Sequence, residues 1–114
     1  MSRFFRGRWE YGSVYVLDVD RVICDPDGRH GILIEEKHES AADRSATITR
    51  SLARKCGWWA GLFVYTTDDG TPNGEVTKID AKFWDPNGGF HPVQGLDFES
   101  FDRWVCQTFG AVAA

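Results

Sequence analysis

Residues 18–38 constrain the fold more than any other part of the sequence. Two apolar segments are joined there by residues 25–28 (DPDG), in which proline and glycine occupy favourable turn positions. This pattern predicts a β-hairpin, with residues 13–20 belonging to its first arm and residues 29–38 forming its second arm. Each arm carries charged side chains near its outer end, where a strand that is buried on both faces would stay apolar.

The charged residues of the two arms can converge on one face. Asp18 and Asp20 are two residues apart, as are Glu35 and Lys37, and side chains two apart on a strand share a face. A turn at positions 26 and 27 sets Asp18 opposite Glu35, whereas a turn at positions 27 and 28 sets Asp20 opposite it, and both registers remain open. The competing interpretation is a solvated hairpin with weak cross-strand ion pairs, each worth under about 1 kcal/mol.

The composition is that of one globular domain. The chain has 114 residues, of which 42% are hydrophobic and 26% charged, and it is rich in aromatic residues, with 5 Trp and 8 Phe. Some of these aromatic side chains could face a partner. The net charge of −4 argues against a broadly basic nucleic-acid surface, although two segments are locally basic. These segments contain Arg3, Arg6 and Arg8, and then Arg44, Arg50, Arg54 and Lys55.

The cysteines and the hydropathy pattern bear on the compartment. Cys24, Cys56 and Cys106 are odd in number and far apart, which favours free thiols over a disulfide framework or a zinc site. No apolar run approaches the ~18 residues that a membrane span requires, and no signal-peptide core is present at the N-terminus. We therefore expect a cytoplasmic protein with no membrane partner.

After the hairpin, the apolar period changes from two to about four residues. Ile48, Leu52 and Cys56 form a stripe that predicts an amphipathic helix over residues 40–56, with Ser40 as its N-cap and Gly57 at its end. A strand at residues 62–66 follows. A strand, a helix and a further strand predict a right-handed crossover between parallel strands.

The C-terminal half predicts two more strands and a second helix. Residues 76–84 alternate as a one-sided strand, and residues 90–93 form an edge strand whose pairing Pro92 limits. Asp97 is placed as the N-cap of the final helix. The apolar stripe of that helix consists of Phe98, Phe101, Trp104, Val105 and Phe109. The expected fold is α/β, with a mixed central sheet of four to five strands flanked by helices.

The charged hairpin residues have the chemistry of phosphodiester hydrolysis. Carboxylate oxygens are the ligands that Mg²⁺ prefers, and Mn²⁺ accepts them as well. A metal held between two carboxylates can activate water, and a lysine on the same face can orient the nucleophile or neutralise the charge that develops on the phosphate. We find no cofactor-binding loop that indicates an organic cofactor.

Asp20, the turn at residues 25–28 and the run Ile34-Glu35-Glu36-Lys37 resemble the core of the PD-(D/E)XK nuclease superfamily. In that core an aspartate on one strand precedes a Glu-x-Lys on its hairpin neighbour, and a helix and another strand follow. The closest branches are archaeal-type Holliday junction resolvases and small phage nuclease-like proteins. The resemblance covers residues 13–67 and implies a restriction-endonuclease-like fold.

The resemblance also implies roles for individual residues. Asp20 and Glu35 become metal ligands, Lys37 becomes the catalytic lysine, and Asp18 is a second or alternative acid. Many relatives have a further glutamate on a helix before the hairpin, and here Glu10 is the only candidate. His38 follows the motif directly and is a possible phosphate contact.

The same resemblance implies the partners. The substrate is DNA, with a branched or Holliday-junction form as the narrower expectation, and a homodimer is the natural assembly because duplex strands are cut in pairs. Contacts to the DNA backbone are assigned to Arg6, Arg8, Arg50 and Arg54, and the cell that the resemblance implies is bacterial or phage-infected. The alternative is an inactive nuclease-like binding protein, such as a phage accessory protein or an inhibitor of a host enzyme. A third possibility is that the substrate is RNA or a nucleotide rather than duplex DNA.

Overall fold

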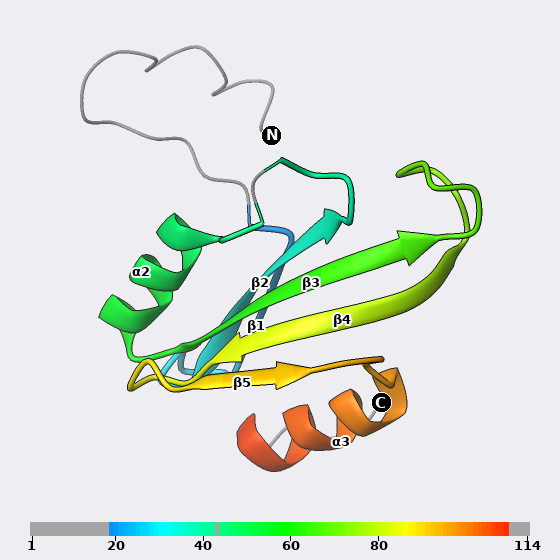
Figure 1. The fold of residues 1–114 in the computed structure, drawn as a ribbon. Helices are drawn as coiled ribbons and strands as arrows, with labels where there is room; N and C mark the ends of the chain where they lie inside the picture. The colour runs from blue at the N-terminus through cyan, green and yellow to red at the C-terminus, as the bar shows by residue number, and fades with distance from the viewer. Residues whose placement is uncertain (1–18, 43, 110–114) are drawn as a thin grey trace, which may run out of the picture.

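A mixed five-stranded sheet organises this computed structural model, which describes residues 19–42 and 44–109 (Figure 1). The strands lie in chain order, β1-β2-β3-β4-β5, and two helices pack on the sheet. The elements are β1 (Arg21–Cys24), β2 (Gly31–His38), α2 (Thr47–Cys56), β3 (Trp59–Thr67), β4 (Val76–Trp84), β5 (Phe90–Val93) and α3 (Phe98–Phe109). The predicted α/β class with a mixed sheet is confirmed.

The predicted hairpin is formed by β1 and β2, which are antiparallel. Gly28 has a φ of 71°, a left-handed conformation that glycine adopts without steric cost, and its amide donates to the Asp25 carbonyl at 3.0 Å. Arg21 pairs with Ile34 and Cys24 with Gly31. The first strand forms at Arg21–Cys24 rather than at the predicted residues 13–20, so Val19 and Asp20 precede it, and residues 13–18 lie outside the described residues.

The predicted crossover is also present. β2 and β3 are parallel neighbours, with α2 between them in the chain, and Leu33 pairs with Ala60. β3 occupies the centre of the sheet and is the strand predicted at residues 62–66, extended at both ends. β4 and β5 continue the sheet as antiparallel strands, as the sequence predicts, and β5 forms one edge.

Helix α2 differs from its prediction at its start. It begins at Thr47 rather than after Ser40, because Ala46 adopts a left-handed conformation with a φ of 51°. Ser40 instead lies in a turn, where its amide donates to Nδ1 of His38. The predicted end is correct: Gly57 has a φ of 71°, and its amide donates to the carbonyl of Arg54.

The buried side of α2 also differs from the prediction. Ile48 and Leu52 are 45% and 44% exposed, and Cys56 is exposed too, whereas Thr49 and Ala53 are the buried residues. Ala53 packs with Leu33 of β2 and Ala60 of β3. Small side chains let the helix approach the sheet closely, so the largest apolar residues were a misleading guide to the packed side.

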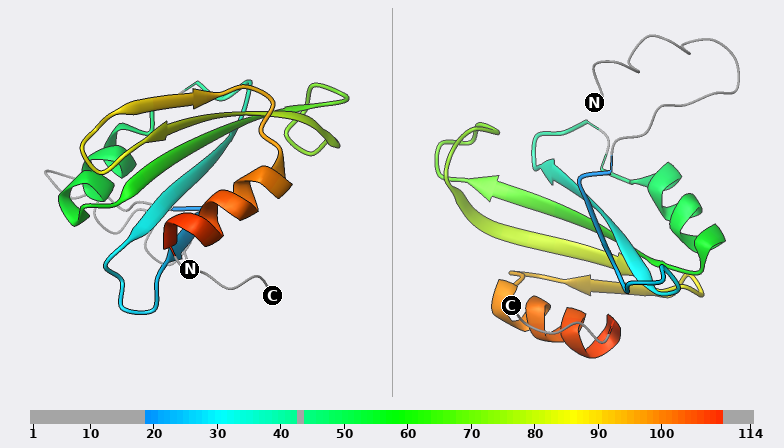
Figure 2. Two further views of the ribbon diagram at one scale, coloured as in Figure 1. Left: turned by 90° about the horizontal axis from the view of Figure 1, so that it is seen from below. Right: turned by 180° about the vertical axis from the view of Figure 1, so that it is seen from behind.

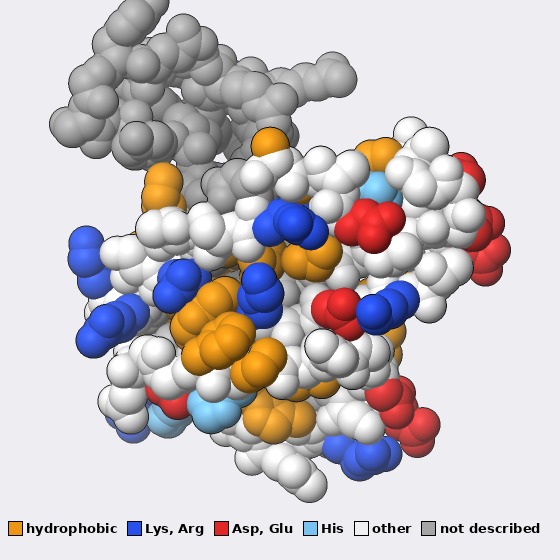
Figure 3. Space-filling model, in the orientation of Figure 1, with side chains coloured by type: hydrophobic (Ala, Val, Ile, Leu, Met, Phe, Trp, Pro, Cys, Tyr) orange, Lys and Arg blue, Asp and Glu red, His pale blue; other side chains and the backbone are white. Residues whose placement is uncertain are grey.

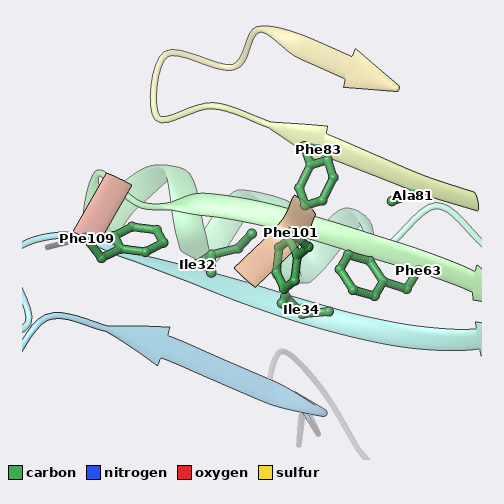
Figure 4. Close-up of a cluster of buried hydrophobic side chains, with 7 residues drawn as sticks. All are labelled: Ile32, Ile34, Phe63, Ala81, Phe83, Phe101 and Phe109. Atoms are coloured by element: carbon green, nitrogen blue, oxygen red, sulfur yellow. The ribbon is translucent and has the colours of Figure 1, made fainter. Parts of the chain in front are cut away.

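The opposite face of the sheet carries the larger core. Ile32, Ile34, Phe63 and Phe83 meet Phe101 of α3 there, as Figure 4 shows. α2 and α3 therefore cover different faces (Figure 2). The Asp97 carboxylate accepts a hydrogen bond from the Glu99 amide at 2.9 Å, which confirms the predicted N-cap.

The apolar stripe of α3 is confirmed except at its first position. Phe101 and Phe109 are buried, and Trp104 and Val105 pack against the same core. Phe98 is 53% exposed, because the first residue after the cap lies on the solvent side of the helix.

Candidate functional site

The register of the hairpin selects one of the two pairings left open by the sequence. Arg21 pairs with Ile34, so the same register continued by one residue sets Asp20 opposite Glu35. Oδ2 of Asp20 accepts a hydrogen bond from the Glu36 amide at 2.7 Å. The Asp20 carboxylate is therefore held against the backbone of β2 at the residue that follows Glu35, and its Oδ1 is the oxygen not used in that bond.

Glu35 extends from β2 toward α2. Its side chain is only 6% exposed, and Oε1 accepts a 2.5 Å hydrogen bond from the hydroxyl of Thr49, which is 1% exposed. Burying a carboxylate is costly unless hydrogen bonds or charges compensate. Thr49 is thus a positioning residue for Glu35 that sequence reasoning missed. The only sequence signal for it is its spacing of four residues from Ala53, which puts both on one side of the helix.

Lys37 shares the α2 face with Glu35 because the two are alternate residues of one strand. It is half-buried, and on β3 its partner in the register is Val64. Glu36 points to the other face and is exposed, as the sequence predicts, and it forms an ion pair with Arg21 at 3.6 Å. Glu35 and Lys37 therefore lie on the α2 face of the sheet, and Glu36 between them lies on the opposite face.

His38 lies at the end of β2 and is buried. Its Nδ1 is 2.7 Å from the Ser40 hydroxyl, and its Nε2 is 3.1 Å from the Thr67 hydroxyl. The ring also packs edge-on against Tyr65, with 5.3 Å between centroids. These contacts give His38 the role of joining the ends of β2 and β3.

The two described arginines predicted to contact DNA lie on α2. The guanidinium of Arg50 stacks 4.1 Å above the ring of Trp84, the last residue of β4. Arg54 is exposed and lies one turn further along the helix, near the turn between β4 and β5 at Gly88. Arg6, Arg8, Glu10 and Asp18 lie outside the described residues.

Asp20 and Glu35 have donor chemistry that fits a hard divalent cation. Each carboxylate commits one oxygen to a hydrogen bond within the protein, and the other oxygen is the potential ligand. Within residues 19–42 and 44–109, no group of three or more His, Cys, Asp or Glu side chains is arranged to hold a metal ion. A metal here would therefore rest on a two-carboxylate set, completed by waters and by substrate phosphate oxygens.

Comparisons with known proteins return no match: no family model fits the chain, and no curated protein and no solved structure is significantly similar to it. In the part of the chain that the structure describes, no helix is both long enough and apolar enough to cross a membrane.

Proposed function

We propose that this protein is a metal-dependent nuclease that hydrolyses phosphodiester bonds in DNA, with Mg²⁺ or Mn²⁺ as its cofactor. The observation that carries the proposal is the hydrogen bond from the Glu36 amide to Asp20, which holds Asp20 against the strand that carries Glu35. Lys37 follows on the same face as Glu35. Two carboxylates and one lysine are the minimal set for this chemistry.

The protein's own residues divide the work in the proposed reaction. Asp20 and Glu35 would hold the cation, which when bound supplies Lewis-acid stabilisation and a more acidic water. The Thr49 hydroxyl keeps the Glu35 carboxylate oriented. Lys37 places its ammonium group where it can orient the attacking water or neutralise charge on the phosphate.

The finer parts of the proposal concern the fold and the assembly. The order hairpin, helix, parallel strand supports a restriction-endonuclease-like core. A homodimer would bring two such sites to the two strands of one duplex, and a branched DNA is the narrower substrate proposed.

A binding protein without catalysis is the alternative, and the burial of Glu35 favours it. A carboxylate that is 6% exposed and bonded to Thr49 is also what a purely structural glutamate would show. In that case the charged hairpin would be the remnant of a nuclease site.

A cleavage assay tests the proposal. The protein is incubated with linear, single-stranded and four-way-junction DNA in Mg²⁺ or Mn²⁺, together with Lys37→Ala and Glu35→Gln. We expect metal-dependent cleavage that falls about 100-fold or more in both variants. Glu36→Gln is the matched control, because it removes a neighbouring carboxylate from the other face of the same strand and should leave cleavage unchanged.

Two results would reject the nuclease. One is the absence of cleavage of all three substrates with either metal, and the other is cleavage that survives in Lys37→Ala. Urea unfolding of each variant verifies that a loss of activity does not come from a failure to fold.

A further inference from the structure

A strip of basic and aromatic side chains runs along the α2 face of the sheet, from α2 and the segment before it across the end of β4 to β5. It consists of Arg44, Arg50, Arg54, Lys82, Trp84 and Phe90, and we call it the basic–aromatic strip. Figure 3 shows this face, with Lys and Arg side chains around a hydrophobic patch, while acidic side chains gather mainly toward one edge of the view. The net charge of −4 conceals this local concentration of positive charge.

The strip follows three adjoining hollows in the surface. The first lies between α2 and the end of β4, the second between residue 44 and β4, and the third above Val64, with volumes of about 270, 420 and 430 Å³. Arg50 and Trp84 line the first two hollows, and Arg44 and Lys82 line the second and third. The hollows therefore form one continuous path.

The third hollow lies over β3, one strand away from the candidate catalytic lysine on β2. Val64, in the third hollow, is the register partner of Lys37 on the neighbouring strand. Lys82 is the partner of Leu62, and Leu62 is the partner of Glu35, so all three strands present these side chains on the same face. A chain-like ligand would have to extend past Val64 to the neighbouring strand to reach Lys37.

The aromatic residues of the strip offer a flat apolar surface. Phe90 on the edge strand β5 is 53% exposed and packs against Trp84, with 5.5 Å between ring centroids. Trp84 also lies under the guanidinium of Arg50 and packs against the cluster of Leu33, Ala53 and Ala60. Trp84 thus fixes Arg50 in place, and Phe90 leaves a ring face for a ligand.

Two carboxylates border the path, and both are engaged by the protein. Asp80 forms an ion pair with Lys78 at 3.3 Å and accepts a hydrogen bond from the Gly95 amide. Asp85 accepts from His91 at 2.8 Å and from the Gly89 amide. The four cations of the strip nevertheless outnumber the two carboxylates that line the same hollows.

We infer that the basic–aromatic strip binds a single strand of nucleic acid, with a base stacked on Phe90 and phosphates against Arg44 and Lys82. Cations that track a backbone, interleaved with an aromatic platform, are the combination that binds single strands. In a duplex the base faces are already stacked on one another, so Phe90 would have no base to meet. The inference rests on the proposed function in one respect only, namely that the bound nucleic-acid strand runs toward Lys37.

Binding is measured without catalysis. Fluorescence anisotropy in EDTA compares a labelled oligomer of about 20 thymidine nucleotides, longer than the ~4–16 nucleotides that one such site covers, with the RNA equivalent and a duplex of equal length. We expect either single strand to bind more tightly than the duplex. Phe90→Ala should weaken single-strand binding about fivefold or more, because one stacked base is worth about 1–3 kcal/mol.

The chain offers closely matched controls. Phe98 on α3 is also 53% exposed but lies away from the strip, so Phe98→Ala should leave binding unchanged. Arg44→Ala and Lys82→Ala should each make the plot of log affinity against log salt shallower by about 0.7 for each phosphate that is no longer neutralised. Arg103→Ala, which removes a cation from α3, should leave that slope as it is.

Equal affinity for duplex and single strand would overturn the inference, as would Phe90→Ala binding like the unaltered protein. Heparin that competes equally with every variant would show a general anion site and overturn it too. Because binding is measured in EDTA, a failure to bind single strands says nothing about metal-dependent cleavage, which is judged by the cleavage assay. Loss of cleavage with binding intact would instead reject the nuclease alone.

Discussion

At the scale of single residues, the least expected feature is a buried polar pair. Glu35 and Thr49 come from different elements, 14 positions apart, and meet beneath α2. A hydroxyl donor offsets part of the cost of burying the carboxylate, since a hydrogen bond to a charged group contributes about 1.5–3 kcal/mol. The pair therefore links the candidate site to the stability of the fold.

Thr49→Val should test this link. The substitution keeps the side-chain shape but removes the donor, so we expect the free energy of unfolding to fall by about 1–3 kcal/mol in urea titrations. In a Glu35→Gln background the same change should cost less, because an uncharged amide is cheaper to leave unpaired. Ser51→Ala, at an exposed position of α2, is the control and should shift stability by about 0.5 kcal/mol or less.

A second prediction at this scale concerns acid stability. The hydrogen bond from the Gly95 amide, followed by the contact with Lys78, holds the pKa of Asp80 below its ordinary value of 3.8. Because the folded-state pKa is the lower one, the contribution of Asp80 is complete above the unfolded value and is lost as the pH falls through the folded value.

Asp80→Asn measures that contribution. The stability gap between the unaltered protein and Asp80→Asn, read from urea midpoints, should be largest above about pH 5 and should close as the pH falls toward about 2. A gap of constant size across this range would show that the charge of Asp80 contributes nothing.

At the scale of elements, α2 shows how tertiary contacts override an amphipathic pattern. The side chains that pack on the sheet are Thr49 and Ala53, while the larger Ile48 and Leu52 remain about half exposed. The approach of the helix to Leu33 and Ala60 leaves room only for small groups. The helix still ends where the sequence predicts, because Gly57 acts through local backbone geometry.

Substitutions on α2 distinguish the two faces. Ile48→Gln and Leu52→Gln should each change the free energy of unfolding by less than about 1 kcal/mol. Ala53→Leu should destabilise by about 1–3 kcal/mol, because the added carbons have no space against the sheet. Chemical unfolding gives both values, and a larger loss for Leu52→Gln than for Ala53→Leu would contradict the observed packing.

At the scale of the whole molecule, the two faces of the sheet do different work. The face under α3 holds the main apolar core, and the face under α2 presents the candidate site and the basic–aromatic strip. Phe101 joins α3 to that core, with its ring 5.5 Å from Phe63 and 6.0 Å from Phe83. The larger apolar core and the proposed binding surface thus lie on opposite faces, and the α2 face adds the smaller cluster of Leu33, Ala53 and Ala60.

Phe101→Ala should show this division. Removing a buried ring leaves a cavity, so we expect a loss of about 3–5 kcal/mol in the free energy of unfolding. Phe98→Ala, on the exposed side of the same helix, should cost less than about 1 kcal/mol. Similar losses for the two variants, measured by thermal or urea unfolding, would contradict the placement of α3.

The sequence by itself determined the order of the elements and some of their ends. Period-two alternation in β4, the Asp97 cap and the glycines at positions 28 and 57 are local signals, and each predicted its element correctly. The placement of Glu36 on the face away from Glu35 also follows from strand geometry alone.

Only the tertiary structure decided which distant side chains meet. The hairpin register that sets Asp20 rather than Asp18 opposite Glu35 depends on one residue of the turn, and both choices satisfy the local pattern. The contact of Thr49 with Glu35 and the alignment of Arg44, Lys82 and Phe90 depend on the crossover and on strand order. These are long-range packing outcomes, which no local periodicity records.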